Sequence, residues 1–132
     1  MSKLIIDSRE HSNLTEYVEK KARNMNIPFG KEWIEFGDYT FNDVCFEAKS
    51  SFDFLQSVQN KRLWKQLDNM DRAFNTNIVI VYGSFDKAFR QFISHAKTKV
   101  NPKTLRILTW KKFYGAIGRI ILDTDCSIIW VK

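Results

Sequence analysis

The chain has 132 residues, of which 44% are hydrophobic and 14% aromatic, so we expect one folded domain with a modest core rather than a disordered polypeptide. Its longest apolar runs are four or five residues, which excludes a transmembrane helix, and its N-terminus is too short and too acidic for a signal peptide. We therefore expect a soluble, intracellular protein, in the cytoplasm or the nucleus, with no membrane partner. The net charge of +6 favours a polyanionic partner, most often nucleic acid.

A buried strand over residues 3–7 is expected to open the chain, and a group of polar side chains follows it. Asp7 ends the apolar run, and Arg9 and Glu10 come directly after it. Functional sites in open α/β sheets gather at the carboxyl ends of strands, although these residues would also suit an ordinary polar loop. Ser12 is a good N-cap for a helix that apolar residues at helical spacing extend to about residue 25.

An antiparallel meander of three strands is expected next, over residues 31–36, 38–41 and 43–49. Alternating polar and apolar residues indicate half-buried strands. Turn-forming residues at 37–38 and 42–43 separate the three strands.

The last of these strands places a carboxylate and an ammonium group on one side of the sheet. Glu47 and Lys49 are two residues apart and therefore point the same way, together with Cys45 and opposite to Ala48. With Asp38 at the preceding turn, two acids and a lysine could hold a hard cation and a water beside a phosphate. Taken singly, the same residues also suit a solvent-facing ion pair and an ordinary turn.

Helices and strands alternate along the rest of the chain. The expected elements are a helix capped by residues 50–51 with Asp53 in its first turn, a second helix after Asn60 that ends near residue 75, a buried strand over 78–82, a helix over 85–97, a segment over 102–109 that fits a helix or a strand and that we interpret as a helix, a helix over 110–121, and a last strand over 127–131. This order predicts a mixed α/β sheet in a single domain over residues 1–132.

The order and spacing of the polar residues resemble the XPF family of structure-specific DNA endonucleases. That family belongs to the PD-(D/E)xK nuclease superfamily and also includes the archaeal Hef nuclease. Its pattern is Asp-x-Arg-Glu, Gly-Asp, and Glu-Arg-Lys with an Asp four residues on. The matching strings here are Asp7-Ser-Arg-Glu10, Gly37-Asp38-Tyr39, Glu47-Ala-Lys49 with Asp53, and Arg62-Leu-x-x-Gln66. The resemblance covers residues 4–82, is weaker over 113–131, and implies a restriction-endonuclease-like sheet flanked by helices.

The resemblance also implies a metal-dependent phosphodiester hydrolase. Asp38 and Glu47 would be the main ligands of Mg²⁺, for which Mn²⁺ would substitute, with the Ala48 carbonyl beside them. Asp7 and Glu10 would complete the acidic cluster or bind through water.

Further roles carry over from the same motifs. Asp38, Glu47 and Lys49 would form the catalytic set, in which Lys49 orients or deprotonates the attacking water and stabilises the developing negative charge. Arg9, Arg62 and Gln66 would hold phosphates or cross-link the site, and Asp53 would orient Lys49 or cap its helix. The residues expected to contact DNA are Lys61, Arg62 and Lys65.

Two departures from the family pattern limit what carries over. Ala48 replaces the usual Arg, and the chain has no room for the helix-hairpin-helix domain that family members commonly add. We expect an endonuclease acting on branched, flap or fork DNA, as a homodimer through the nuclease domain. A Holliday-junction resolvase or a less selective DNA nuclease remains open, because surfaces outside the motif read substrate shape. A non-catalytic DNA-binding scaffold subunit is a third alternative, although such subunits have lost the acids that are present here.

Overall fold

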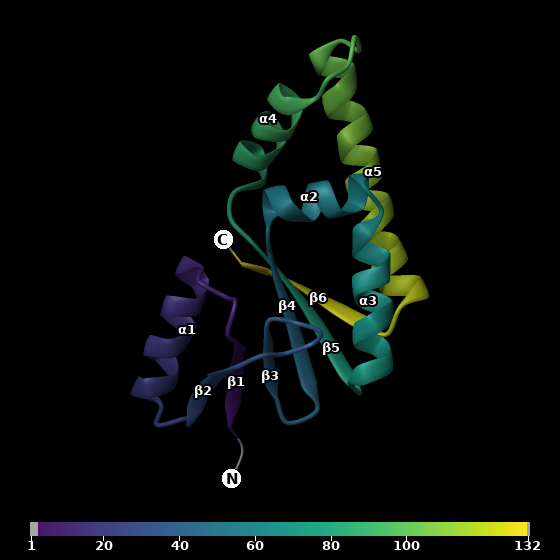
Figure 1. Cartoon of the computed structure of the whole chain (residues 1–132). Coiled ribbons are helices and arrows are strands. Elements are labelled where there is room, and N and C mark those ends of the chain that lie inside the picture. The colour runs from purple at the N-terminus through teal and green to yellow at the C-terminus, as the bar shows by residue number, and fades with distance from the viewer. Residues whose placement is uncertain (1–2, 132) are drawn as a thin grey trace.

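The computed structural model describes residues 3–131, which form a six-stranded mixed sheet flanked by five helices (Figure 1). In chain order the elements are β1 (Leu4–Asp7), α1 (Asn13–Asn24), β2 (Phe29–Glu32), β3 (Tyr39–Phe41), β4 (Val44–Ser50), α2 (Ser51–Gln59), α3 (Arg62–Ala73), β5 (Thr76–Tyr82), α4 (Phe85–His95), α5 (Pro102–Asp123) and β6 (Cys126–Val131). The strand order across the sheet is β2-β1-β3-β4-β5-β6. The predicted single-domain α/β fold is confirmed.

The predicted three-stranded meander is wrong in its first strand. β2 occupies residues 29–32 and pairs in parallel with β1, whereas residues 33–38 form a loop. The reason lies in the backbone of Ile34, whose N–H donates to the Asp7 carboxylate and whose carbonyl accepts from Arg9. These backbone groups are bound by side chains and cannot join a strand ladder. Only β3 and β4 form the antiparallel hairpin that was expected.

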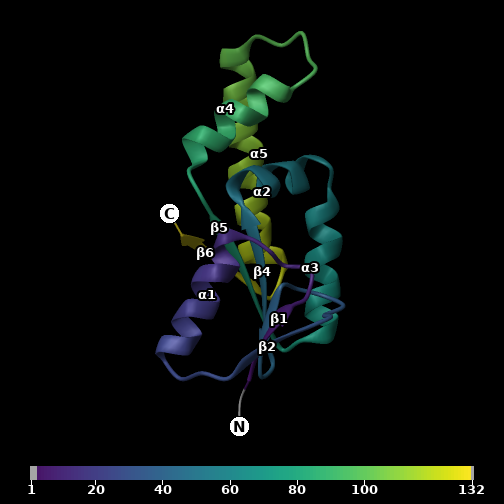
Figure 2. The same ribbon diagram turned by 60° about the vertical axis from the view of Figure 1, so that its left-hand side comes forward.

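Helices cover both faces of the sheet (Figures 1 and 2). The pairing register places Ile6, Tyr39 and Phe46 side by side on the face that α1 covers, where the Thr15 side chain meets the Tyr39 hydroxyl. Side chains alternate along a strand, so Glu47 of β4 lies on the opposite face, toward α2, α3 and α5. Both views also show α4 and the beginning of α5 extending beyond the end of the sheet.

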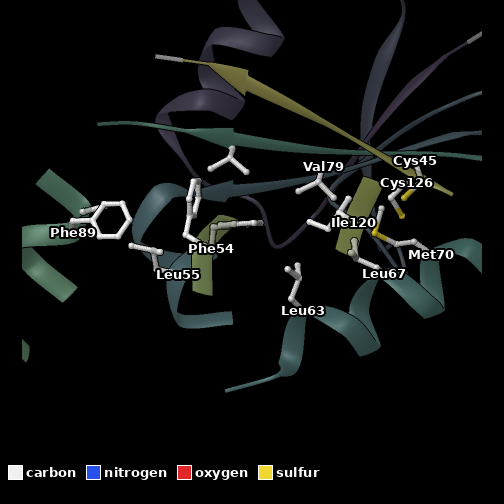
Figure 3. Packing of buried hydrophobic residues seen from close by; sticks show 13 residues of the cluster. Cys45, Phe54, Leu55, Leu63, Leu67, Met70, Val79, Phe89, Ile120 and Cys126 are labelled. Carbon is white, nitrogen blue, oxygen red and sulfur yellow. The ribbon is translucent and has the colours of Figure 1, made fainter. Parts of the chain in front are cut away.

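The main core lies between the sheet and the helices α2, α3 and α5 (Figure 3). Residues that are almost completely buried come from every layer, including Phe54, Leu63, Leu67, Val79 and Ile120. On α3 the buried positions recur at helical spacing, so the adjacent polar positions of that helix face the edge of the core. The core therefore fixes how α3 presents polar side chains to the acidic residues of the sheet.

Helix boundaries follow the side chains that cap them. The Ser12 and Ser50 hydroxyls accept from the backbone N–H groups of Thr15 and Asp53, as expected of N-caps. α5 begins after Asn101 and is one continuous helix, which confirms the helical interpretation of residues 102–109. None of the helices within residues 3–131 is both long enough and apolar enough to cross a membrane.

Gly37 is required by the turn that leads into β3. Its φ of +89° lies in the left-handed region, and a Cβ at this position would clash with the Cys45 sulfur. Gly115, in contrast, lies within α5 and has nothing within 4 Å of an added Cβ. The two glycines therefore offer a matched pair.

We predict that Gly37→Ala lowers the free energy of unfolding by about 2–4 kcal/mol, because it combines a steric clash with an unfavourable φ. Gly115→Ala should raise it by about 0.5–1 kcal/mol, since alanine is the better residue inside a helix. Denaturant unfolding monitored by circular dichroism measures both changes. Equal stability of the two variants would contradict the role of Gly37. Adding Cys45→Ala to Gly37→Ala should recover the part of the lost stability that is due to the clash with the Cys45 sulfur.

Candidate active site

An acidic cleft of about 350 Å³ lies where the end of β1, the loop before β3, the middle of β4 and one side of α3 meet. Five carboxylate residues line it, together with other side chains from these four segments. The lining consists of Asp7, Arg9, Glu10, Glu35, Phe36, Gly37, Asp38, Glu47, Gln66, Asn69 and Met70. Six of the residues predicted from sequence therefore come together, namely Asp7, Arg9, Glu10, Asp38, Glu47 and Gln66.

Backbone pairing brings three of the acids onto the same face of the sheet. The Asp7 N–H donates to the Asp38 carbonyl at 2.8 Å, and the Asp38 N–H donates to the Phe46 carbonyl at 2.8 Å. The β3–β4 ladder ends at the pair of Tyr39 and Phe46, and just beyond it the Asp38 carboxylate accepts from the Ala48 N–H, which brings it beside Glu47. Asp7, Asp38 and Glu47 thus occupy three neighbouring strands or strand ends.

The Asp38 carboxylate is held against the edge of β4. Its Oδ2 accepts from the Ala48 backbone N–H at 2.8 Å. Burial, and then the negative charge of Glu47, raise the pKa of Asp38 from 3.8 to about 7, although the Ala48 hydrogen bond opposes this shift. In the protein alone, this carboxyl group therefore takes up a proton near neutral pH.

Glu47 and Lys49 form a buried pair on β4. Their side chains are only 13% and 7% exposed, and Lys49 Nζ lies 3.7 Å from Glu47 Oε1. Burial raises the pKa of Glu47, and the neighbouring Lys49 charge opposes the rise. The geometry places one positive group directly beside the acids of the cleft, within a poorly solvated region where its charge acts strongly.

Asp7 and Arg9 hold the loop that borders the cleft. Arg9 Nε donates to Asp7 Oδ2 at 3.0 Å, and its Nη2 donates to the Ile34 carbonyl at 2.7 Å. Asp7 Oδ1 accepts from the Ile34 N–H at 3.2 Å. The guanidinium group also lies 5.5 Å from the ring centre of Trp33. Arg9 and Asp7 together therefore join the end of β1 to the loop at Ile34.

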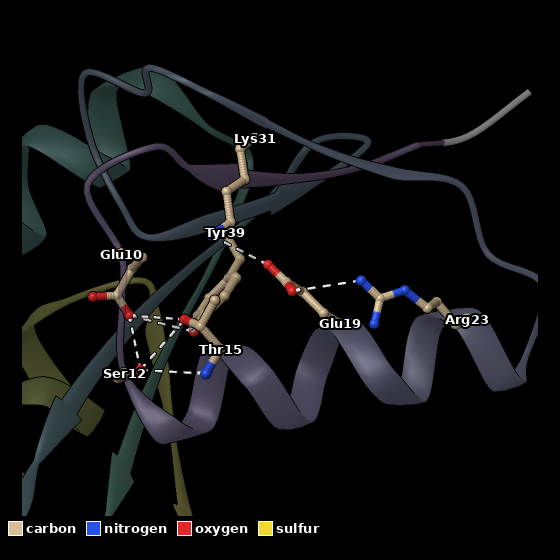
Figure 4. Close-up of polar contacts among 7 residues, drawn as sticks. All are labelled: Glu10, Ser12, Thr15, Glu19, Arg23, Lys31 and Tyr39. Carbon is tan, nitrogen blue, oxygen red and sulfur yellow. Dashed lines mark hydrogen bonds and ion pairs between the residues drawn. The ribbon is translucent and has the colours of Figure 1, made fainter.

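Glu10 is turned toward α1 and is bound by hydroxyl groups (Figure 4). Its Oε2 accepts from Ser12 and Thr15 at 3.2 Å each and from Tyr39 at 3.4 Å. Burial raises the pKa of Tyr39 to about 12, so this phenol remains a donor at neutral pH. One oxygen of Glu10 is thus occupied by the scaffold of α1 and β3.

The helix α3 adds polar groups that complete the cleft wall. Gln66 Oε1 is buried and has no hydrogen-bond partner among the described residues. Asn69, three residues on, lines the same cleft. Sequence reasoning missed Asn69 and Glu35, and the helical spacing from Gln66 was the signal that could have indicated Asn69.

Six predicted residues lie outside the cleft lining, and two of them, Ala48 and Lys49, directly follow Glu47 on β4. Lys61, Arg62 and Lys65 are exposed at the beginning of α3 and do not line the cleft. Asp53 lies in the first turn of α2 and makes no ion pair with Lys49, although both residues belong to the described part of the chain. Its position agrees with the helix-capping alternative for Asp53, since a negative charge near a helix N-terminus is favourable.

The donor set fits a hard divalent cation that relies on few protein ligands. Within residues 3–131, no three His, Cys, Asp or Glu side chains converge closely enough to enclose an ion. Asp7 and Glu10 are bound by several scaffold donors, whereas Asp38 accepts one backbone bond from Ala48, Glu47 pairs within this range only with Lys49, and the Glu47 charge acts against ionised Asp38. Mg²⁺ commonly uses one or two carboxylates and retains waters, and the unpartnered Gln66 oxygen could accept a hydrogen bond from such a water.

The arrangement of acids and a lysine on one sheet face agrees with the family that the sequence matches. The model of the ERCC4 domain matches residues 6–132, so this chain belongs to the ERCC4 family, the XPF-type nuclease domain of structure-specific DNA endonucleases. The resemblance to the XPF family is confirmed.

Two curated relatives share this domain over a small part of their length. A protein of Methanocaldococcus jannaschii that carries the name of an ATP-dependent RNA helicase is 28% identical over 131 residues, which are 98% of this chain and 14% of the relative. The DNA repair endonuclease UVH1 of Arabidopsis thaliana is 32% identical over 90 residues, which are 67% of this chain and 9% of the relative. The chain thus spans less than a sixth of either.

Solved structures confirm the fold. XPF from Aeropyrum pernix in complex with DNA matches with a TM-score of 0.70 and 18% identity, over 99% of this chain and 56% of that chain. A further structure of XPF from Aeropyrum pernix matches with a TM-score of 0.67 and 19% identity, over 97% and 55%.

The raised pKa of Asp38 gives a pH-dependent prediction. Between pH 3.8 and about 7 the folded state binds a proton that the unfolded state has released, so the stability contributed by this group falls as pH rises. At about pH 8 and without metal, Asp38→Asn should be more stable than the unaltered protein by about 1 kcal/mol or more, and the difference should shrink toward about pH 4. Denaturant unfolding at several pH values tests this.

Asp68→Asn serves as the control, because Asp68 is exposed and pairs with Arg72 on the surface of α3. It should show no comparable pH dependence. Mg²⁺ should stabilise the unaltered protein at about pH 8 and have less effect on Asp38→Asn. If Asp38→Asn were less stable than the unaltered protein at every pH, the ionised Asp38 carboxylate would not destabilise the fold and the prediction would be wrong.

Proposed function

We propose that this domain is a metal-dependent endonuclease that hydrolyses phosphodiester bonds in branched, flap or fork DNA. One observation supports this most strongly. The Asp38 carboxylate is anchored to the Ala48 N–H beside Glu47, whose negative charge helps to raise the pKa of Asp38, and Lys49 Nζ lies 3.7 Å from Glu47 Oε1. Two neighbouring acids with an adjacent buried ammonium group suit a site that binds a cation and a phosphate together.

Each residue of the cleft has a role in this proposal. Asp38 and Glu47 would hold Mg²⁺ or Mn²⁺, which when bound stabilises charge on the scissile phosphate and activates water. Lys49, which is fixed by Glu47, orients the attacking water and stabilises negative charge that develops on the phosphate oxygens. Arg9 keeps the loop over residues 33–36 in place, and Gln66 accepts a hydrogen bond from a water in the cleft.

Cleavage of labelled fork, flap and four-way-junction DNA in the presence of Mg²⁺ tests the activity. Asp38→Asn and Lys49→Met should each slow single-turnover cleavage by about a hundredfold or more, because each removes a group that acts on the reacting phosphate. Asp68→Asn, an equal charge change on exposed α3, should cut at the unaltered rate. If Lys49→Met is folded and cuts normally, the catalytic assignment is wrong.

The cleavage map on the same DNAs separates the related possibilities. Symmetric cuts confined to four-way junctions would assign a resolvase, and cuts throughout simple duplex would assign a less selective nuclease. Tight binding without any cleavage, in metal and at several pH values, would assign a scaffold role. The intact pair of Asp38 and Glu47 is the reason to expect cleavage.

We further propose that the domain forms a homodimer through α5 and the edge strand β6. Tyr114 and Ile121, seven residues apart on one side of α5, are 64% and 63% exposed, and Leu122 is 82% exposed. The neighbouring strand β6 is the open edge of the sheet, and its Trp130, on the face that α5 covers, is 38% exposed. An apolar strip beside an open sheet edge is typical of a surface that another chain covers.

Ile121→Glu combined with Leu122→Glu should convert a dimer to a monomer in sedimentation velocity, because two buried charges at an interface would be unpaired. Tyr17→Glu is the matched control, since Tyr17 is 65% exposed but lies on α1. An unchanged sedimentation coefficient for the double variant would exclude this strip as the interface.

A further inference from the structure

Positive charge is concentrated in one continuous segment of the chain. Residues 87–122 contain nine Lys or Arg and no Asp or Glu, whereas the rest of the chain contains twelve Lys or Arg and fifteen Asp or Glu. The whole excess of positive charge therefore lies in this segment. The cleft described above is lined by five carboxylates, so it repels phosphates unless a cation is bound. Attraction of a polyanion has to come from elsewhere on the protein.

The segment forms most of α4, the connection over residues 96–101 and nearly all of α5. In both views α4 and the beginning of α5 project beyond the end of the sheet, and α5 then runs back along the side of α3 (Figures 1 and 2). Phe89 stacks on Trp110 at 4.2 Å between ring centres and so joins the two helices of the projection. The positive residues are thus carried on a firmly packed support.

A first hollow, of about 540 Å³, lies between the end of α4 and α5. Lys97, Lys111 and Lys112 line it, and Phe92 and Leu105 contribute apolar walls. All three lysines belong to exposed positions of the chain. The hollow therefore offers several mobile ammonium groups around a concave surface, which suits the curved outline of a phosphate backbone.

A second hollow, of about 430 Å³, continues along α5 to the turn between α2 and α3. Lys61, Lys112 and Arg119 line it, with Trp64 between them. Arg119 lies 4.0 Å above the Trp64 ring centre, a contact that holds the guanidinium group in place. Lys112 borders both hollows and donates to Gln59, which also borders both, at 2.8 Å.

The charges of these hollows are not neutralised by the protein itself. Within residues 3–131 no carboxylate lies within ion-pair distance of Lys97, Lys111, Lys112 or Arg119. Arg106, elsewhere on α5, differs in that it approaches Asp86 at 3.8 Å. Unpaired cations on a concave surface are typical of a site for an anionic ligand.

We propose that Lys61, Lys97, Lys111, Lys112 and Arg119 form one basic track that binds the phosphate backbone of a duplex arm of DNA. The track ends at the beginning of α3, and Gln66 and Asn69 of the same helix line the acidic cleft. A duplex held along α5 would therefore be delivered to the cleft by way of α3. The choice of DNA as the polyanion rests on the proposed nuclease function, whereas the track itself rests on the charges and hollows.

Fluorescence anisotropy with a labelled fork DNA in metal-free buffer measures binding without cleavage. Lys97→Gln combined with Lys111→Gln should weaken binding at low salt and reduce the slope of log Kd against log salt concentration by about 1.8, since each lost phosphate contact removes about 0.9. Lys20→Gln combined with Lys21→Gln makes the same charge change on exposed positions of α1 and should leave the slope unaltered.

Equal slopes for the two double variants would overturn the basic track. The proposal would also be overturned if poly-glutamate competed for the site as strongly as unlabelled DNA does, because the surface would then suit an acidic protein. If the protein binds DNA through the track but never cuts it, the basic track is supported and the nuclease proposal is wrong. If the protein cuts DNA but the salt slope does not depend on Lys97 and Lys111, the nuclease proposal is supported and the basic track is wrong.

Discussion

The backbone ladder between β3 and β4 is the constraint on which the cleft depends. The ladder ends at the pair of Tyr39 and Phe46, and just beyond it the Asp38 carboxylate accepts from the Ala48 N–H, which brings it beside Glu47. The turn that starts this ladder requires φ of +89° at Gly37 and leaves no room for a Cβ beside Cys45. A glycine with no chemistry of its own thus determines where two acids meet.

The arrangement is costly for the isolated domain and useful for a site that binds cations. Asp38 and Glu47 are both removed from much of the solvent, and the pKa of each is raised by burial. The packed layer of α2, α3 and α5 stabilises the fold independently of these groups. Strongly shifted carboxyl groups in a cleft are typical of functional sites, because folding alone does not favour them. Lys49, buried beside Glu47, belongs to the same arrangement.

Charge is divided between two regions with different tasks. The acids gather where strand ends meet, and the lysines and arginines of residues 87–122 lie on helices that project from the sheet. α3 connects the two regions, since it borders the second basic hollow at Trp64 and the acidic cleft at Gln66. Under the proposed function, substrate attraction and bond cleavage would therefore have separate structural supports, so that each could be altered while the other is left intact.

The sequence by itself determined the local features, namely the caps at Ser12 and Ser50, the face of β4 that carries Glu47 and Lys49, and the family, because spacing and chain order express these directly. Tertiary structure alone decided which strands pair and which polar groups remain free. An alternating pattern specifies the face of a strand but not its neighbour, so β2 was assigned to the wrong partner. Likewise, the bonds from the Ile34 N–H to Asp7 and from the Tyr39 hydroxyl to Glu10 cross 27 and 29 residues, so spacing along the chain does not express them.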